Sequence, residues 1–258
     1  MNKRITEAFQ NGKAFIPFIT CGDPSLEITE QLVYAMEEAG ADLIELGIPF
    51  SDPTAEGPVI QAANVRALSG GVTTDKIFAM VEKIRKHTAI PLVFMTYANV
   101  VFSYGTERFI KKAAEIGMDG LILPDVPFEE KEEFDRVCKV YGQDLISLIA
   151  PTSHERIAQI AREAEGFVYC VSSLGVTGMR SQITTDIGAM AELVKKEKDI
   201  PCAVGFGISN PEQAKKMASQ ADGVIVGSAI VKLCEAHGKD CIPYVKEYVK
   251  SMKDAIRE

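Results

Sequence analysis

The chain of 258 residues is long enough for one large α/β barrel or for two small domains, and it can bury a substantial core. Its net charge of −8, with lysines and arginines scattered along the sequence, argues against a nucleic acid or an anionic membrane as a partner. The N-terminal residues lack the apolar core of a signal peptide, and no apolar run approaches the roughly 18 residues of a membrane span, so we expect a cytoplasmic protein.

Eight short apolar runs recur along the chain, and most of them precede a segment with helical periodicity. The runs cover residues 15–20, 42–48, 91–97, 120–125, 145–150, 167–172, 202–207 and 223–228. The periodicity predicts helices at Ser25–Glu38, Thr73–Lys86, Thr106–Ile116, Glu129–Tyr141, Ser153–Glu163, Pro211–Ala218 and, at the C-terminus, Tyr244–Ile256. The chain therefore alternates strand, loop and helix.

This alternation predicts a (β/α)8 TIM barrel. Runs that are apolar on both faces suit parallel strands covered by helices, and eight such units fit a chain of this length. The alternative is an open doubly wound sheet, but that fold would have about six strands, and no GxGxxG motif opens the first unit. No linker divides the chain, so we predict one domain over residues 1–258, with an extra N-terminal helix around Ile5, Ala8 and Phe9 that closes the bottom of the barrel.

Glycines follow the seventh and eighth runs, each before an expected helix. Gly207 and Gly227 lie at these two positions, where barrels of this kind often bind phosphate. Glycine allows backbone N–H groups to approach an anion closely, whereas ordinary tight turns are the alternative explanation. The pair of loops predicts a phosphate site.

An acidic residue, Glu45, lies inside the second apolar run. Burial would raise its pKa toward neutrality, as a general acid or base requires, although a structural ion pair is the alternative. Two more acids, Asp52 and Glu56, follow in a Pro- and Gly-rich loop, where each could simply stabilise a turn. Several carboxylates could therefore meet at one strand end.

Other kinds of catalytic site find little support in the sequence. The eight runs contain no lysine for a Schiff base, and the three histidines lie far apart, without the spacing of a metal site. The six cysteines show no CxxC spacing, so we expect them to be reduced and structural. GxSxG and P-loop motifs are absent from the sequence. We expect cofactor-free and metal-free acid–base chemistry on a phosphorylated substrate.

Seven stretches of the chain carry a more specific pattern: FIPFITCGDP, IELGIPFSDPTAEGPVIQAANVRAL, FMTYANVVF, LILPDVP, SSLGVTGMR, VGFGISNPEQ and VGSAIVK. Together they resemble the α subunit of tryptophan synthase, in the same order and over nearly the whole chain. The resemblance implies a (β/α)8 lyase that cleaves indole-3-glycerol phosphate to indole and D-glyceraldehyde 3-phosphate by a retro-aldol reaction. It also implies that the chain needs no metal or organic cofactor.

The resemblance also assigns site residues. Glu45 matches the catalytic glutamate that transfers protons, and Tyr169 matches a tyrosine near the reacting end of the substrate. The indole pocket would be lined by Phe18, Tyr97, Ile122 and Phe206, and the phosphate would be bound by Gly178, Gly207, Gly227 and Ser228. Residues 174–188 match a mobile lid, in which Thr177 would meet the catalytic carboxylate.

The resemblance further implies a partner. Family members pair with a pyridoxal-phosphate-dependent β subunit, usually in an αββα heterotetramer, and pass indole to it for tryptophan biosynthesis. Asp52 and Pro53 match the loop that contacts this partner. Two alternatives stay open: a free-standing indole-releasing lyase, and a non-catalytic subunit that only activates its partner.

One residue departs from the family pattern. The acid before Gly-Pro is most often aspartate, thought to stabilise the positive charge that develops on the indole N–H, and here it is Glu56. A displacement of about 1 Å in a catalytic group can cost about 100-fold in rate. We therefore hypothesise that Glu56 performs the role of the aspartate from a slightly withdrawn loop.

Overall fold

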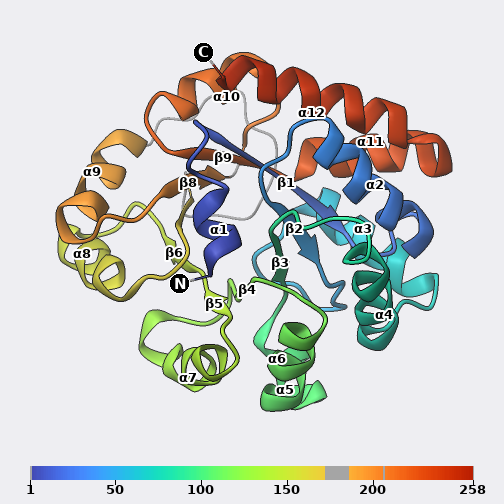
Figure 1. The fold of residues 1–258 in the computed structure, drawn as a ribbon, viewed down its shortest axis with the longest axis horizontal. Helices are drawn as coiled ribbons and strands as arrows, with labels where there is room; N and C mark the ends of the chain where they lie inside the picture. The colour runs from blue at the N-terminus through green and yellow to red at the C-terminus, as the bar shows by residue number, and fades with distance from the viewer. Residues whose placement is uncertain (1, 172–185, 206, 258) are drawn as a thin grey trace.

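The structure, a computed structural model, describes residues 2–171, 186–205 and 207–257, and these form a nearly closed barrel of parallel strands surrounded by helices (Figure 1). The described strands form one sheet in the order β5-β4-β3-β2-β1-β9-β8-β7-β6, and all paired neighbours run parallel. The strands are β1 Ala14–Thr20, β2 Ile44–Gly47, β3 Leu92–Met95, β4 Gly120–Ile122, β5 Asp144–Leu145, β6 Ser147–Ile149, β7 Val168–Val171, β8 Cys202–Gly205 and β9 Gly223–Val226. The predicted TIM barrel is confirmed.

The fifth predicted strand is split in the structure. Its first part, β5, pairs with β4, whereas its second part, β6, pairs with β7, and Ile146 lies between the two parts. The strands at the two ends of the sheet, β5 and β6, are therefore consecutive in the chain. This connection brings the sheet round into a barrel.

Helices alternate with the strands and cover the outside of the barrel (Figure 1). The α-helices are α1 Lys3–Glu7, α2 Leu26–Glu38, α3 Pro58–Ser69, α4 Thr74–Ile84, α5 Ala98–Tyr104, α6 Thr106–Glu115, α7 Glu132–Val140, α8 His154–Glu163, α9 Ile187–Glu197, α10 Pro211–Ala218, α11 Ser228–His237 and α12 Ile242–Ile256. Two 3-10 turns, η1 Phe128–Glu130 and η2 Gly238–Asp240, complete the described elements.

Three of the predicted helices begin at a residue that caps the observed helix. Ser25, Thr73 and Ser153 each accept a hydrogen bond from the backbone N–H three residues further on, at the beginning of α2, α4 and α8. Three helices were not predicted: α3, α5 and α9. A helix was expected after Gly227, without bounds, and α11 begins there. In α3, apolar residues surround most of the helix, so the 3.6-residue period is weak in its sequence.

Strand β2 shows how the barrel separates an outer core from an inner one. Ile44 and Leu46, which flank Glu45 on this strand, belong to the outer core beneath the helices. Leu43 belongs to the inner core. Because side chains alternate along a strand, Glu45 shares the inward face with Leu43. The fold therefore directs this carboxyl group into the barrel.

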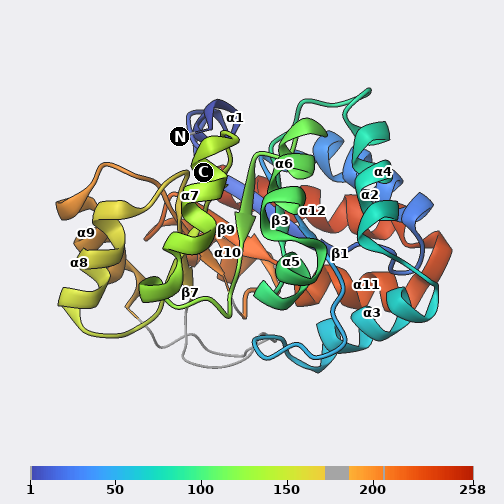
Figure 2. The same cartoon turned by 90° about the horizontal axis from the view of Figure 1, so that it is seen from below.

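Helix α1 closes the bottom of the barrel, as predicted. Its Ile5 is fully buried within the inner core. Gly120 and Gly166 make room for this side chain, because a Cβ at either position would come within 3.3 Å of Ile5. Figure 2 shows α1 at one end of the barrel and the loop between β2 and α3 at the other end.

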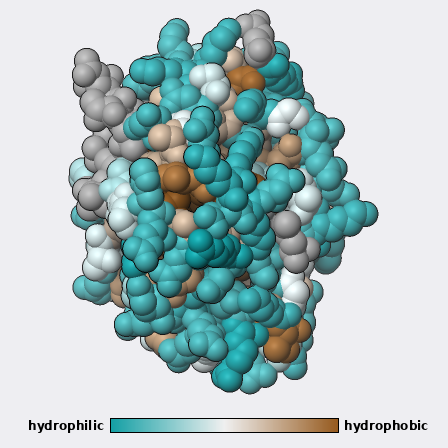
Figure 3. Space-filling model, turned by 90° about the vertical axis from the view of Figure 1, so that its left-hand side faces the viewer, coloured by the Kyte–Doolittle hydropathy of each residue, from teal (hydrophilic) through white to brown (hydrophobic). Residues whose placement is uncertain are grey.

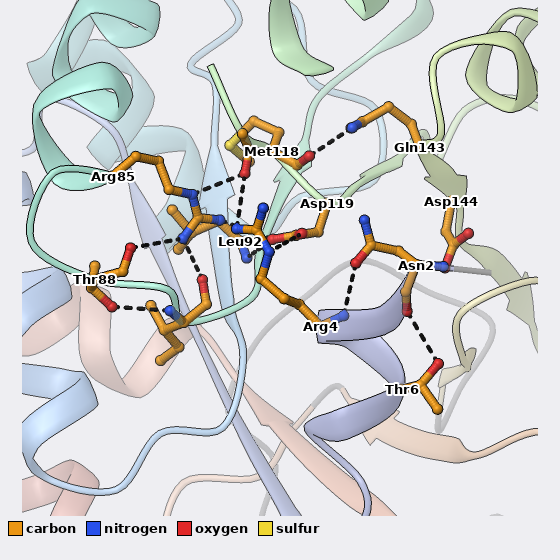
Figure 4. Close-up of polar contacts among 12 residues, drawn as sticks. Asn2, Arg4, Thr6, Arg85, Thr88, Leu92, Met118, Asp119, Gln143 and Asp144 are labelled. Atoms are coloured by element: carbon orange, nitrogen blue, oxygen red, sulfur yellow. Dashed lines mark hydrogen bonds and ion pairs between the residues drawn. The ribbon is translucent and has the colours of Figure 1, made fainter. Parts of the chain in front are cut away.

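Charged residues anchor α1 to the barrel (Figure 4). The buried Asp119 lies 3.1 Å from the Arg4 guanidinium and 2.8 Å from that of Arg85, and it also accepts the Leu92 N–H at 2.9 Å. At the N-cap of α1, the Asn2 backbone N–H donates a hydrogen bond to the Asp144 carboxylate at 2.8 Å. These contacts satisfy polar groups that the closed bottom would otherwise bury unpaired.

The surface is hydrophilic over most of the face that Figure 3 shows, as is typical of a globular protein. This face lies over α8 and α9 and has a few small and separate hydrophobic patches. In the three described segments no helix is long and apolar enough to cross a membrane. All six cysteines are free and buried, as expected for structural thiols.

Candidate active site

A cavity of about 40 Å³ lies inside the barrel, where its lining residues come mainly from strand ends and the loops that follow them. It is lined by Phe18, Glu45, Glu56, Ile60, Met95, Tyr169, Gly207, Ile208, Ile225, Gly227 and Ser228. Seven of these residues were assigned to the site from the sequence. The fold thus brings candidate catalytic, indole-binding and phosphate-binding residues to one place.

Glu45 is the most deeply buried acid of this cavity, with 1% of its surface exposed. Neither carboxyl oxygen has a hydrogen-bond partner among the described residues, and none of the ion pairs between them involves this side chain. Burial raises its pKa from the ordinary 4.5 to about 8. At neutral pH the described surroundings therefore favour the protonated carboxyl, which is able to donate a proton.

Glu56 reaches the same cavity from the loop before α3. The Asn64 side-chain amide donates to its Oε2 at 2.6 Å, and the Tyr97 hydroxyl also forms a hydrogen bond with it. Burial raises the pKa of Glu56 to about 7, while these two hydrogen bonds act in the opposite direction. Near neutral pH, Glu56 is therefore divided between its ionised and its protonated form.

Tyr169 projects from β7 into the inner core. Its pKa is raised well above 10, first by burial and then by the nearby charge of Glu45, so its hydroxyl stays protonated. The ring lies against Gly205 on β8, where a Cβ would come within 2.5 Å of the hydroxyl oxygen. Gly205 therefore makes room for a residue of the candidate site.

Two glycines also determine where Phe18 lies. A Cβ at Gly47 would come within 2.6 Å of the Phe18 ring, and one at Gly227 within 3.2 Å. The ring consequently rests against the backbone of both neighbouring strand ends. It supplies an apolar wall beside Glu45, its partner on the neighbouring strand.

Three candidate phosphate residues come from two loops, Gly207 from the loop after β8 and Gly227 with Ser228 from the start of α11. Gly227 is the N-cap of this helix and Ser228 is its first residue, while Gly207 has a φ of +90°. The N-terminus of a helix carries partial positive charge and directs N–H groups outward, so it favours an anion. All three residues line the cavity that contains Glu45.

Two residues assigned to the indole pocket lie beside the cavity and do not line it. Tyr97 packs on Phe50, with 5.3 Å between ring centroids, and its hydroxyl accepts the Ala55 N–H at 3.0 Å. Ile122 is fully buried in the inner core. Phe206, Thr177, Gly178 and residues 174–185 of the expected lid lie outside the described residues.

The expected partner loop is exposed at its tip. Asp52 is exposed and accepts a hydrogen bond from the Ser51 hydroxyl at 2.5 Å, which is ordinary turn chemistry. Pro53 is partly exposed. Neither residue lines the cavity.

Sequence reasoning missed Asn64, which contacts Glu56, and the four apolar lining residues Ile60, Met95, Ile208 and Ile225. Asn64 lies on α3, which was not predicted, and its distance from Glu56 along the chain gives no signal of a contact. A second cavity of about 190 Å³, bounded by apolar residues such as Leu145 and Leu148, contains none of the described site residues. No group of three metal-ligating side chains was found in the part of the chain that the structure describes.

Comparison with known proteins identifies relatives over the whole length of the chain. The family model described as "Tryptophan synthase alpha chain" matches residues 6–257. A tryptophan synthase alpha chain from Lacticaseibacillus casei is 46% identical and aligns over 98% of this chain and 95% of its own length. Another, from Halalkalibacterium halodurans, is 52% identical and aligns over 88% of this chain and 87% of its own length.

Solved structures agree with the sequence relatives. Tryptophan synthase subunit alpha from Legionella pneumophila superposes with a TM-score of 0.89 at 39% identity, covering 99% of this chain and 98% of that one. A chain of the mutually activated tryptophan synthase a2b2 complex from Pyrococcus furiosus gives a TM-score of 0.87 at 34% identity, covering 95% and 99%.

Proposed function

Because the chain belongs to the tryptophan synthase alpha chain family, whose members are lyases that cleave indole-3-glycerol phosphate, we propose that Glu45 and Glu56 carry out this cleavage in the cavity described above. The chain is a carbon–carbon lyase of this family. The observation that best supports the residue assignment is the presence of a buried, unpaired Glu45 and a second carboxyl group in one cavity.

The proposed reaction needs two proton transfers and the stabilisation of one charge. Glu45 donates its proton to C3 of the indole ring, which leaves a positive charge on the ring nitrogen. The ionised Glu56 accepts the indole N–H and stabilises that charge. Glu45 then takes the proton from the adjacent glycerol hydroxyl as the carbon–carbon bond breaks, which releases indole and D-glyceraldehyde 3-phosphate.

The remaining residues bind and orient the substrate. We assign the indole ring to Phe18, Tyr97, Ile122 and Phe206, and the phosphate to Gly178, Gly207, Gly227 and Ser228. Tyr169 lies beside Glu45 at the reacting end. The lid residue Thr177 would reach the catalytic carboxylate when the loop closes over the substrate.

No step of this mechanism requires a cofactor. Protonated Glu45 supplies the acid and its conjugate base receives the second proton, so the side chains of the protein are sufficient. We therefore propose a cofactor-free α reaction in the cytoplasm, carried out by one domain over residues 1–258. Pyridoxal phosphate is expected only in the partner subunit.

The chain pairs with a tryptophan synthase β subunit, and its structural relatives include chains of a tryptophan synthase complex and of an a2b2 complex from Pyrococcus furiosus. We propose an αββα heterotetramer in which Asp52 and Pro53 contact the partner. Ala55 in the same loop is hydrogen-bonded to Tyr97, which in turn contacts Glu56. A partner that moves this loop could thus alter a proposed catalytic carboxylate.

One assay distinguishes the three possible roles of the chain. Indole release from indole-3-glycerol phosphate is measured with and without a purified β subunit. Strong stimulation by the β subunit supports the proposed role, and equal rates support a free-standing lyase. No release under either condition would show a non-catalytic subunit and refute the proposed mechanism.

A further inference from the structure

We propose that Asn64, on helix α3, is a positioning residue that aims the Glu56 carboxylate into the cavity and favours its ionised form during the reaction. The inference deepens the proposed function, since it rests on Glu56 being the carboxylate that stabilises the indole cation. The contact between Asn64 and Glu56 is seen only in the folded structure.

The geometry places Asn64 in direct contact with Glu56. Asn64 has only 4% of its surface exposed, and its amide nitrogen lies 2.6 Å from Glu56 Oε2. One turn earlier on the same helix, the Gln61 side chain donates to the backbone oxygen of Glu56 at 2.8 Å. Helix α3 therefore holds Glu56 at both its backbone and its carboxylate.

Helix α3 is itself fixed to the barrel. Arg66, two residues after Asn64, forms two hydrogen bonds of 2.8 Å with the buried Asp23, which follows β1. The same guanidinium lies 2.9 Å from Glu235 on α11. Two parallel bonds between a guanidinium and a carboxylate restrict orientation strongly, so Asn64 donates from a rigid support.

The length of the Glu56 side chain makes such support necessary. Glutamate has one more rotatable bond than aspartate, so its carboxylate can occupy more positions. Asn64 approaches it from α3, and Tyr97 approaches it from the end of β3. Two donors on separate elements confine the carboxylate to one position, which offsets the extra methylene.

The charges around Glu56 make the donors important for ionisation as well. The groups that face it are Glu45 from β2, Tyr169 from β7 and Tyr97, beyond which lies Asp125. None of these groups is cationic, and the described residues form no ion pair with Glu56. Burial favours its protonated form, and Asn64 is the strongest opposing influence.

The test is the pH dependence of indole release by the α subunit assembled with its β subunit. Asn64→Leu removes the donor, and Asn64→Asp places a second carboxyl group where the donor was. Both raise the pKa of Glu56, so a higher pH is needed to ionise it. In a plot of kcat/KM against pH, the acid limb is the rise that accompanies the ionisation of Glu56. We expect its midpoint to move up by roughly one pH unit in Asn64→Leu and further in Asn64→Asp.

A structural role for Asn64 would give a different result. If Asn64 only stabilises α3, both variants lose activity equally at every pH and the acid limb stays in place, which overturns the inference. We expect instead that the loss of kcat/KM is largest at acid pH and shrinks to a few-fold as the pH rises toward about 8, where Glu45 begins to lose the proton that it donates, with KM little changed. Val65→Leu is the matched control, because Val65 is the next residue on the same helix and is 64% exposed.

Two further measurements cover the remaining cases. If Asn64→Leu does not fold, Asn64→Asp preserves the shape of the side chain, and carboxyl carbon NMR of Glu56 reports its ionisation directly. The Glu56→Gln variant separates the two proposals: if it is fully active, the assigned role of Glu56 fails. If it is inactive but the Asn64 variants keep the original acid limb, only the role of Asn64 fails.

Discussion

Phe18 on β1 and Glu45 on β2 lie directly opposite each other in the parallel ladder, so an aromatic ring and a carboxyl group enter the barrel at the same level. The Phe18 ring can take this position because Gly47 and Gly227 have no side chain to obstruct it. The ring helps to exclude water from the carboxyl group, and this dehydration raises the pKa of Glu45. Backbone geometry and acid strength are therefore connected at the candidate site.

Replacing Glu45 should abolish the reaction without disturbing the fold. Glu45→Gln keeps the size of the side chain but cannot transfer a proton, so we expect indole release to fall by about 100-fold to 10,000-fold. Binding to the β subunit should be nearly unchanged, because Glu45 lies inside the barrel. Steady-state assays and a titration with the β subunit measure both quantities, and retained turnover would refute the acid–base assignment.

Glu45 should also make the protein less stable as the pH rises. Its pKa is about 8 in the folded state and near 4.5 in the unfolded chain, so from about pH 4.5 to about pH 8 the folded state binds more protons. The free energy of unfolding therefore falls across this range, by up to a few kcal/mol. It stays level outside the range as far as this group is concerned.

The Glu45→Gln variant checks this dependence. Because glutamine does not titrate, the variant should exceed the unsubstituted protein in unfolding free energy at about pH 8 and resemble it more closely at about pH 4.5. Urea denaturation at several pH values measures the difference. The exposed Glu133→Gln serves as the control, and equal pH slopes for all three proteins would contradict the buried, unpaired state of Glu45.

Glu56 should matter for the rate because it stabilises charge. Glu56→Gln removes the negative charge while keeping the side-chain length, and we expect kcat to fall by about 100-fold. Glu56→Asp keeps the charge but withdraws it from Asn64, so an intermediate loss is expected. Steady-state kinetics of both variants provide the test, and undiminished activity in Glu56→Gln would exclude the proposed role.

Gly205 should be required for the placement of Tyr169. Gly205→Ala introduces a Cβ within 2.5 Å of the Tyr169 hydroxyl oxygen, so the ring must move. We expect a loss of about 1–3 kcal/mol in unfolding free energy, together with reduced kcat. In the Gly205→Ala Tyr169→Leu double variant, removal of the hydroxyl and of the ring carbons near the added Cβ should restore part of the stability. Additive losses in this double-mutant cycle would count against a direct clash.

The ion pairs at the bottom of the barrel should affect stability and not catalysis. Arg85→Met removes one of the two guanidinium groups beside the buried Asp119, and we expect a loss of about 3 kcal/mol in unfolding free energy. Indole release at low temperature, where the variant stays folded, should be unchanged. Asp119 pairs with Arg4 on α1, and α1 lies at the opposite end of the barrel from the loop between β2 and α3 (Figure 2). A large fall in kcat with unchanged stability would contradict this separation.

Much of the fold could be predicted because its signals are local. Eight apolar runs, each followed by a loop or helix, define the parallel barrel, and Ile5 near the N-terminus indicates the helix that closes it. Helices with a capping serine or threonine were located within a few residues. Helix α3 was missed because its sequence has no clear polar face.

The candidate catalytic residues could also be predicted from the sequence, because few residue types can transfer a proton or bind a phosphate. A glutamate within an apolar run, and glycines after the last two runs, stand out from their neighbours in the amino-acid sequence. The resemblance to a family added residues such as Phe18 and Tyr169, which composition and spacing alone do not distinguish from core residues.

The sequence by itself determined the barrel and the inward face of Glu45, because alternation and periodicity depend on residues that are near one another in the chain. Only the tertiary structure decided which groups surround the two carboxyl groups. Asn64 meets Glu56, Tyr169 rests on Gly205, and Phe18 packs against Gly227 because folding brings separate strands and helices together. Burial and hydrogen bonding set the proton affinity of a carboxyl group, and both are properties of the packed molecule.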